Sequence, residues 1–254
     1  MLLAIDVGNT HTVVGLFNNS ELADHWRIAT DAERTSDELA LMIQQFLGFH
    51  GFSFDDVITG VAVSSGVPRV TGALREMTER YFGFPALVLE PGVRTGMPIL
   101  YDNPKEVGAD RIANAVGAYD LYGGPSIVVD FGTATTIEAI SGKGEYLGGA
   151  IFPGVEISLD ALFERAAGLR RVELVEPKHV IGKSSLESIQ SGCIYGFSAQ
   201  VDGLVDRFRA EIGDCPAIGT GGLGELIIPY TRTVQYFEPW LTLYGLRIVF
   251  ERNQ

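Results

Sequence analysis

Two segments place an acidic residue, a glycine and hydroxyl residues directly after an apolar run. They are Asp6-Val7-Gly8-Asn9-Thr10 and Asp130-Phe131-Gly132-Thr133-Ala134-Thr135-Thr136. Glycine lets backbone N–H groups approach a phosphate closely, threonine hydroxyls can donate to its oxygens, and a carboxylate at a strand end can hold hydrated Mg²⁺. Taken singly, each segment could be an ordinary tight turn, because Asp, Asn and Gly are common in such turns. The repetition of the pattern favours two phosphate-binding turns.

The composition limits the classes of partner. The chain has 254 residues, 46% of them hydrophobic, which is enough for one large domain or two of modest size. It carries 19 basic and 32 acidic residues, a net charge of −13 at pH 7. Such a charge disfavours nonspecific binding to nucleic acid or anionic lipid. The closest basic cluster is Arg170-Arg171, which a solvated loop explains, so we expect no nucleic-acid partner and no membrane association.

The cysteines and the first residues bear on the compartment. Cys193 and Cys215 are the two cysteines and form no Cys-x-x-Cys pair, so neither a disulfide framework nor a thiolate metal site is supported. The apolar start, Met1 to Ile5, is broken at once by Asp6, and no apolar run approaches the roughly 18 residues of a membrane span. These features predict a cytoplasmic protein.

The first half of the chain predicts the element order βββαβαβ. Thr35-Ser36-Asp37-Glu38 has the form of a capping box and precedes apolar residues at helical spacing, which predicts a helix over 36–49. A second helix is expected over 67–82 and a third around 112–119. The expected strands are 2–5, 12–17, 21–29, 57–63 and 86–89.

A similar pattern restarts in the second half. Strands are expected at 127–129, 135–140, 146–151, 216–219 and 234–237, and helices from Val155, from Ser185 and over 241–252. Both halves open βββα, without a residue-level repeat or a flexible linker. We therefore expect two lobes that share an interface, residues 1–113 and 114–254.

The order of the motifs resembles one known family. A repeated βββαβαβ unit with one phosphate turn in each half is similar to the superfamily of acetate kinase, sugar kinases, heat-shock ATPases and actin. The resemblance is closest to the type III pantothenate kinases and runs across nearly the whole chain. Its further motifs are Gly108-Ala109-Asp110-Arg111, Gly148-Gly149-Ala150-Ile151-Phe152-Pro153-Gly154, Thr220-Gly221-Gly222 and Leu241-Thr242-Leu243-Tyr244-Gly245-Leu246. It implies an α/β fold of two similar ribonuclease H-like (actin-like ATPase) domains, each with a mixed β-sheet, and a cleft between them.

The resemblance also implies an activity and its cofactors. A homodimeric kinase would use ATP to convert pantothenate to 4′-phosphopantothenate, the first committed step of coenzyme A synthesis. Asp6 would face Mg²⁺ through water, whereas Asp130 corresponds to the family's ligand for a monovalent cation, K⁺ or NH₄⁺. His11 is expected to be a bystander rather than a catalyst. The residues expected to bind ATP are Asp6, Val7, Gly8, Asn9, Thr10, His11, Thr12, Val13 and Thr133.

The pantothenate side would include Gly108, Ala109, Asp110 and Arg111. By resemblance, Asp110 accepts the proton of the attacking hydroxyl in an in-line transfer, a task that suits a carboxylate. The planar fork of Arg111 could hold the carboxylate of pantothenate. From residue types alone, Asp110 could instead stabilise a helix start while Arg111 forms an ion pair at the surface.

Two further positions correspond to substrate contacts of the family. Tyr101, before Asn103-Pro104, would wall the pantoyl pocket; a packed loop tyrosine is the alternative. Ser185 stands where the family has a threonine in a Gly-Lys-x-Thr stretch, so it keeps the hydroxyl and loses the methyl group. It could instead simply cap the following helix. The Thr220-Gly221-Gly222 segment would let adenosine lie close to the backbone.

Two other functions stay open on the sequence. One is a kinase of the same architecture that acts on another small alcohol or hydroxy acid. The other is a non-catalytic regulatory protein that keeps the ATP-binding fold. The sequence contains no Gly-x-x-x-x-Gly-Lys-Ser/Thr loop, no His-Glu-x-x-His pair and no Gly-x-Ser-x-Gly elbow, which argues against several other enzyme classes.

Overall fold

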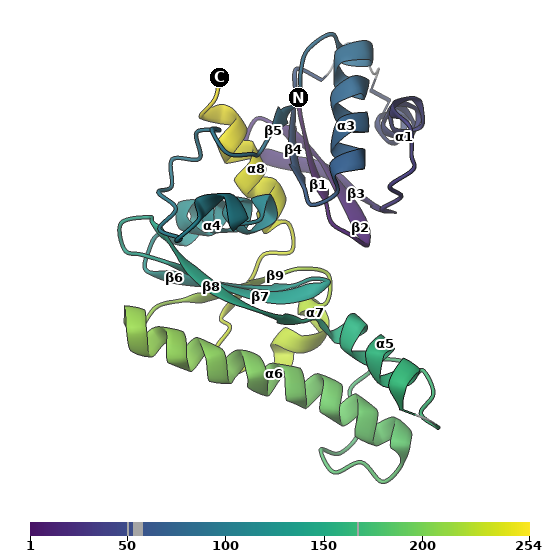
Figure 1. The fold of residues 1–254 in the computed structure, drawn as a ribbon, viewed down its shortest axis with the longest axis vertical. Helices are drawn as coiled ribbons and strands as arrows, with labels where there is room; N and C mark the ends of the chain where they lie inside the picture. Colours follow the sequence, from purple (N-terminus) through teal and green to yellow (C-terminus); the bar gives the residue numbers. More distant parts are fainter. Residues whose placement is uncertain (50, 53–57, 167) are drawn as a thin grey trace. The chain divides into compact units, whose positions relative to one another are not determined.

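Two five-stranded mixed sheets with one shared strand order form the framework of the chain (Figure 1). The computed structural model describes residues 1–49, 51–52, 58–166 and 168–254. The first sheet has the order β3-β2-β1-β4-β5, and the second, read from its β8 edge, has the order β8-β7-β6-β9-β10. In both sheets, the first three strands of this order are antiparallel neighbours. The last two strands run parallel to the central strand, which is β1 in the first sheet and β6 in the second. The predicted duplication of pattern is therefore present in space.

The elements follow the predicted order closely. The strands are β1 (Leu2–Val7), β2 (His11–Asn18), β3 (Glu21–Ala29), β4 (Gly60–Ser65), β5 (Leu87–Val88), β6 (Ser126–Phe131), β7 (Ala134–Ile140), β8 (Tyr146–Pro153), β9 (Ala217–Thr220) and β10 (Tyr236–Phe237). The α-helices are α1 (Ser36–Gly48), α3 (Pro68–Met77), α4 (Ala109–Tyr122), α5 (Val155–Arg165), α6 (Ser185–Ile212), α7 (Gly224–Ile227) and α8 (Leu241–Glu251). Shorter helical turns are η1 (Thr78–Phe82), η2 (Pro104–Glu106) and η3 (Ile228–Tyr230).

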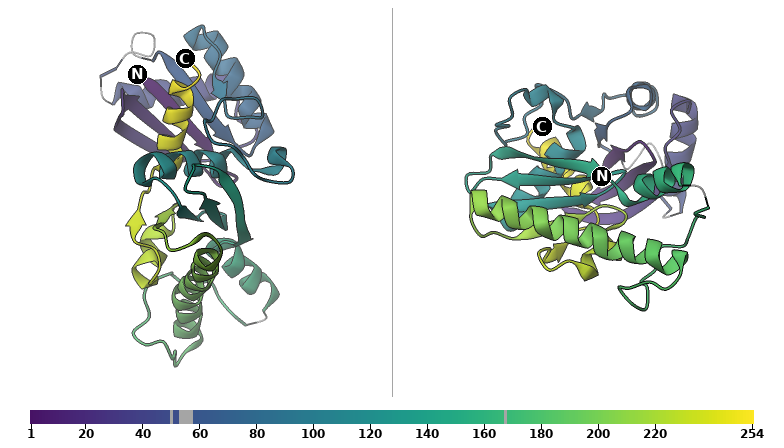
Figure 2. Two further views of the ribbon diagram at one scale, coloured as in Figure 1. Left: turned by 90° about the vertical axis from the view of Figure 1, so that its left-hand side faces the viewer. Right: turned by 60° about the horizontal axis from the view of Figure 1, so that its bottom comes forward.

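The chain divides into two compact units, and the division differs from the predicted one. Unit 1 consists of Met1–Met97, Asp102–Gly117 and Leu241–Gln254, and unit 2 of Pro98–Tyr101 and Ala118–Trp240. The predicted boundary at 113/114 left the last helix in the second domain. That helix, α8, instead packs on β1, β2 and β4 (Figure 2), so burial of its apolar side chains joins it to unit 1.

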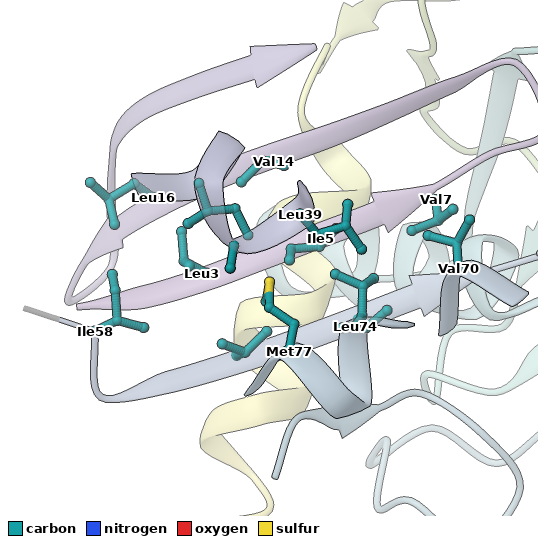
Figure 3. Close-up of a cluster of buried hydrophobic side chains, with 14 of the residues drawn as sticks. Leu3, Ile5, Val7, Val14, Leu16, Leu39, Ile58, Val70, Leu74 and Met77 are labelled. Atoms are coloured by element: carbon teal, nitrogen blue, oxygen red, sulfur yellow. The ribbon is translucent and has the colours of Figure 1, made fainter. Parts of the chain in front are cut away.

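The core of unit 1 lies on the face of the first sheet that α1 and α3 cover (Figure 3). Leu3, Ile5 and Val7 of β1 point into this core together with Leu74 and Met77 of α3. Because side chains alternate along a strand, the residues between them in β1 point to the opposite face, where α8 lies. Each fully buried aliphatic side chain contributes about 1.5–3 kcal/mol.

Unit 2 repeats this arrangement. Ile127, Val129 and Phe131 of β6 point into a core with α5 and α6, and α6 runs along that face of the sheet (Figure 1). By the same alternation, Asp130 points to the opposite face. Asp6 in β1 and Asp130 in β6 are therefore equivalent in their sheets: each faces away from the helices that pack against the neighbouring apolar residues.

Several predicted boundaries differ from those of the structure. The strand predicted at 57–63 is Gly60–Ser65 in the structure, since its register with β1 runs from Leu2 to Val7; residue 57 lies outside the described residues. The helix predicted over 67–82 changes to a π-helical turn at Thr78, whose hydroxyl bonds to the Arg75 carbonyl. The α4 helix begins three residues before the predicted apolar positions.

The capping box predicted for the first helix is confirmed. The Thr35 hydroxyl accepts from the Glu38 backbone N–H at 3.3 Å, and Glu38 Oε2 accepts from the Thr35 backbone N–H at 2.8 Å. Two otherwise unpaired backbone donors are thus satisfied where the chain enters α1. No helix in the described part of the chain is both long and apolar enough to cross a membrane.

Helices α4 and α8 touch backbone to backbone in unit 1. A Cβ atom on Gly245 would lie 1.8 Å from the Ala113 carbonyl oxygen, and one on Gly117 would lie 2.9 Å from the Leu241 carbonyl oxygen. The Thr242 hydroxyl donates to Asn114 Oδ1 at 2.7 Å beside this crossing, and Asn114 is fully buried. The glycines are therefore what allows α4, which carries Asp110, to be held against α8.

We predict that Gly245→Ala destabilises the protein by about 1–3 kcal/mol, because the added methyl group must separate two helix backbones. Denaturant unfolding followed by circular dichroism would measure this. The matched control is Gly196→Ala in α6, where a Cβ meets nothing within 4 Å and where helix propensity alone should stabilise by up to about 1 kcal/mol. Equal unfolding midpoints for the two variants would contradict the packing argument.

Candidate functional site

The first turn joins β1 to β2 directly after Asp6-Val7. The Gly8 N–H donates to the His11 carbonyl oxygen at 3.0 Å. A Cβ atom on Gly8 would lie 3.1 Å from that oxygen, so a residue with a side chain would crowd the turn. Asn9, Thr10 and His11 are exposed. The turn thus presents backbone and side-chain polar groups at the end of the strand that carries Asp6.

Thr30, which follows β3, holds this turn in shape. Its backbone N–H donates to the Thr10 carbonyl at 2.9 Å, and its hydroxyl donates to the Gly8 carbonyl at 2.7 Å. The Thr12 hydroxyl lies 2.9 Å from the Thr30 hydroxyl. Since the Thr30 hydrogen is given to Gly8, Thr12 is the donor of that bond. The buried Thr12 side chain therefore acts inside the turn. Sequence reasoning missed Thr30, because its partners are distant in the chain.

The second turn joins β6 to β7, is one residue shorter than the first, and is also closed by the N–H of its glycine. The Gly132 N–H donates to the Ala134 carbonyl at 3.2 Å, and Thr133 is exposed. The Gly154 N–H donates to the Thr133 carbonyl at 3.1 Å, and a Cβ on Gly154 would lie 2.4 Å from that oxygen. The start of α5 is thus pressed onto the turn. The first N–H groups of a helix have no partner within the helix and favour anions, so this end of α5 reinforces the turn electrostatically.

Oxygen atoms gather around Asp130. Asp130 pairs with Thr136 on β7 and with Thr220 on β9, so the three side chains share one face of the sheet. The Thr136 hydroxyl is buried and has no hydrogen-bond partner among the residues that the structure describes. Gly221 has φ +92°, and a Cβ there would lie 2.4 Å from Asp130 Oδ1. Carboxylate, hydroxyl and carbonyl oxygens are the ligands that hard cations prefer.

Asp110 and Arg111 lie in the first turn of α4 in very different environments. Asp110 is exposed, and its Oδ1 accepts from the Arg111 backbone N–H at 2.8 Å. A Cβ on Gly108 would lie 2.5 Å from the same Oδ1, so the glycine makes room for the carboxylate. Arg111 is only 7% exposed. The alternative that Arg111 pairs at the surface was therefore wrong, because Arg111 is buried.

Tyr101 is fixed to the edge of the second sheet. The Leu100 N–H donates to the Tyr146 carbonyl at 2.8 Å, and the Tyr146 N–H donates to the Pro98 carbonyl at 2.9 Å. The ring centroids of Tyr101 and Tyr146 are 6.3 Å apart. Tyr101 therefore packs as the alternative proposed, and the residue is half-buried.

Ser185 is the first residue of α6, and it is not the cap. The Ser184 hydroxyl accepts from the Glu187 N–H at 3.2 Å, so Ser184 takes the capping role that the sequence offered to Ser185. Ser185 instead lines a pocket of about 860 Å³ between α5 and α6. Burial raises the pKa of the Cys193 thiol in the same pocket, so it is neutral near pH 7.

The structure groups some of the predicted residues and separates others. In unit 2, Asp130, the turn at Thr133, Gly221 and the start of α5 meet at one end of β6. Ser185 lies with α5 and α6, on the face of the sheet opposite Asp130. The first turn and Asp110 belong to unit 1, where α8 packs against both β1 and α4.

Among the residues that the structure describes, histidine, cysteine and acidic side chains form no cluster that could hold a metal ion. The cross-strand neighbours of Asp130 are the neutral residues Thr136 and Thr220.

Comparison with known proteins places the chain in one family. The model of the family described as type III pantothenate kinase matches residues 2–207. The type III pantothenate kinase of Streptomyces griseus subsp. griseus is 56% identical over 261 residues, covering 100% of this chain and 98% of its own length. Those of Frankia alni and Moorella thermoacetica are 56% and 54% identical, with 100% of both chains covered.

Solved structures share the fold at low sequence identity. A conserved Campylobacter jejuni protein assigned to the Baf family of transcriptional activators has a TM-score of 0.62 at 19% identity, covering 99% of this chain and 98% of its own. An inorganic polyphosphate/ATP-glucomannokinase from Arthrobacter sp. strain KM has a TM-score of 0.53 at 13% identity, covering 100% and 99%. The predicted α/β fold of two similar ribonuclease H-like domains is confirmed. Because the family model and relatives that are more than half identical match along the chain, it belongs to the type III pantothenate kinase family.

Proposed function

We propose that this protein transfers the γ-phosphoryl group of ATP to pantothenate and forms 4′-phosphopantothenate for coenzyme A synthesis. The observation that carries the proposal is the match to type III pantothenate kinases over the whole chain at 51–56% identity. The two strand-end turns and the exposed carboxylate at the start of α4 support it, since phosphoryl transfer needs positioning and charge stabilisation more than covalent chemistry.

ATP would be held through its phosphates by the two turns. In unit 1 the donors would come from the segment Asp6 to Val13, and in unit 2 from Thr133. The matched construction of the turns supports this, because each leaves exposed polar groups beside a strand-end carboxylate. Thr12 would contribute indirectly, because its hydroxyl is hydrogen-bonded to Thr30, which holds the turn in shape. Asp6 would hold Mg²⁺ through water, and the ion would neutralise charge on the phosphates.

Asp110 would take the proton of the pantothenate 4′-hydroxyl. The hydroxyl oxygen forms a bond to the γ-phosphorus while the bond from that phosphorus to the bridging oxygen breaks, and ADP leaves. The exposure of Asp110 supports this role, because a general base must reach its substrate. Gly108 and Ala109 would leave room for the substrate beside the carboxylate. Arg111 would hold the pantothenate carboxylate, and Tyr101 would wall the pocket.

A monovalent cation, K⁺ or NH₄⁺, would bind at Asp130. The buried Thr136 hydroxyl supports this, because an unsatisfied buried oxygen is costly unless a ligand pairs with it. Thr220 on the same face and the backbone at Gly221 would complete an oxygen cage. A bound cation would offset the negative charge of Asp130 close to the second turn.

The working form would be a cytoplasmic homodimer in which Ser185 serves the site of the partner copy. Ser185 lies across the unit 2 sheet from Asp130, so it is poorly placed to act beside Asp130 of its own chain. Apolar side chains next to it are exposed: Ile181 is 80% and Leu186 is 50% accessible. Large exposed apolar groups in a cluster favour a protein interface. Both cysteines are free thiols, as suits a reducing compartment.

We expect the purified protein to phosphorylate pantothenate when given ATP, Mg²⁺ and K⁺. Mass spectrometry of the product, with ADP release measured in parallel, tests this. The same assay with Na⁺ in place of K⁺ should run more slowly, because the smaller ion fits the oxygen cage at Asp130 less well.

Two results would contradict that expectation. ADP release with another small alcohol but not with pantothenate would make the protein a kinase of different substrate. Measurable ATP binding with no ADP release from any of these mixtures would favour a non-catalytic regulatory protein.

We predict that Asp110→Asn lowers kcat by roughly 10²- to 10⁴-fold, because the amide cannot accept the proton. ATP affinity, measured by calorimetry, should change little. The control is Asp120→Asn, which alters another exposed aspartate of the same helix and should leave kcat within about twofold. A fully active Asp110→Asn enzyme would remove Asp110 from the mechanism.

The partner role of Ser185 predicts complementation in mixed dimers. Asp110→Asn and Ser185→Leu proteins should each turn over poorly at subsaturating pantothenate. After mixing and subunit exchange, about a quarter of the wild-type activity should return, because half of the dimers then hold one intact site. The particles should sediment at twice 27.5 kDa. A mixture that stays inactive despite confirmed exchange, or a monomeric protein, would refute the shared site.

A further inference from the structure

Tyr146 and Glu138 form an enclosed polar pair in unit 2. Tyr146 is the largest completely buried side chain in the described chain, and Glu138 is also 0% exposed. The Tyr146 hydroxyl donates to Glu138 Oε2. A buried carboxylate is costly to fold even when it is hydrogen-bonded, and an apolar pair of similar volume is often more stable. Stability of the fold is therefore an insufficient reason for the presence of this pair.

The main chain of Tyr146 is hydrogen-bonded to the backbone segment that precedes Tyr101. It accepts from the Leu100 N–H and donates to the Pro98 carbonyl, and it forms a parallel bridge with Ile99. These contacts hold the segment before Tyr101 against the first residue of β8. A shift of Tyr146 would therefore move Tyr101 through the main chain.

The ring of Tyr146 also packs against the ring of Tyr101. Their centroids lie 6.3 Å apart with the planes tilted by 59°, within the range of about 4.5–7 Å in which aromatic rings attract. Near the same Tyr101 ring, Gly148 has φ +124°, and a Cβ there would lie 3.5 Å from Tyr101 Cε2. Few residues other than glycine adopt that backbone conformation. The Tyr101 ring thus lies close to both the Tyr146 ring and the bare backbone of Gly148.

We infer that Tyr146 and Glu138 are positioning residues for the substrate, which they orient through Tyr101 without touching it. Glu138 fixes the tilt of the Tyr146 ring by accepting its hydroxyl hydrogen, and that ring with the backbone of β8 fixes Tyr101. The inference rests on the proposed function, because it takes Tyr101 as a wall of the pantothenate pocket. On this inference, Tyr146 and Glu138 contribute to the affinity for pantothenate.

The test is Tyr146→Phe, which keeps the ring but removes the hydroxyl group that donates to Glu138. The KM for pantothenate should rise about 5- to 10-fold, whereas kcat and the KM for ATP should stay within about twofold, since Tyr101 binds substrate and transition state alike. Glu138→Gln keeps a side-chain oxygen that can accept from the Tyr146 hydroxyl, so its KM for pantothenate should rise less. In a Tyr101→Ala background, Tyr146→Phe should produce no further rise.

The chain offers a matched control. Tyr122 donates its hydroxyl hydrogen to Glu238, which gives a second tyrosine–carboxylate pair in unit 2. Tyr122→Phe should lower the unfolding temperature as a lost hydrogen bond does, yet leave the pantothenate KM unchanged. A rise in KM with Tyr122→Phe equal to that with Tyr146→Phe would mean that general loosening is the cause, and would overturn the inference.

The remaining outcomes separate this inference from the proposed function. If Tyr101→Ala raises the pantothenate KM and Tyr146→Phe does not, the positioning role is overturned and the pantothenate kinase proposal stands. If Tyr101→Ala leaves the KM unchanged, both the pocket role of Tyr101 and the positioning role are overturned. Should Tyr146→Phe fail to fold, Glu138→Gln decides by the same comparison, with pantothenate affinity measured by calorimetry.

Discussion

Strand pairing in the middle of each sheet is the constraint on which the site depends. β1 and β6 are flanked on both sides by paired strands, so their side chains have only two faces to occupy. Packing of the apolar residues against helices takes one face and leaves Asp6 and Asp130 on the other. The two carboxylates are therefore aimed by the same apolar residues that stabilise the sheets.

Close backbone approach is the second recurring device. Gly154 lets the start of α5 press on the second turn, Gly221 brings a loop over Asp130, and Gly245 lets α8 touch α4. At each place a Cβ atom would fall inside van der Waals contact with main-chain or carboxylate oxygen. These motif glycines are therefore required for packing within the protein, in addition to any room they leave for a ligand. Motif and fold are coupled at these points.

Local patterns in the sequence predicted what depends on near neighbours. The capping box at Thr35, the helix after Ser184 and the repeated strand order all follow from residues within a few positions of each other. The same reasoning assigned helix capping to Ser185 instead of Ser184 as one alternative and placed Arg111 at the surface as another. The Ser184 cap is a hydrogen bond from the Glu187 N–H three residues later, which is also local, whereas the burial of Arg111 depends on tertiary packing.

The amino-acid sequence was sufficient to predict the family, the fold class, the order of elements and the residues of both turns, because hydrophobic periodicity and ordered motifs can be recognised without any knowledge of packing. The three-dimensional structure was needed to show that α8 packs on the first sheet and that Thr30 closes the first turn. It was also needed to show that Ser185 lies on the face of the second sheet opposite Asp130, and that Tyr146, which is bonded to Glu138, packs against Tyr101. These facts rest on contacts between residues far apart in the chain. Such contacts arise from burial and hydrogen bonding in three dimensions, which no local spacing encodes.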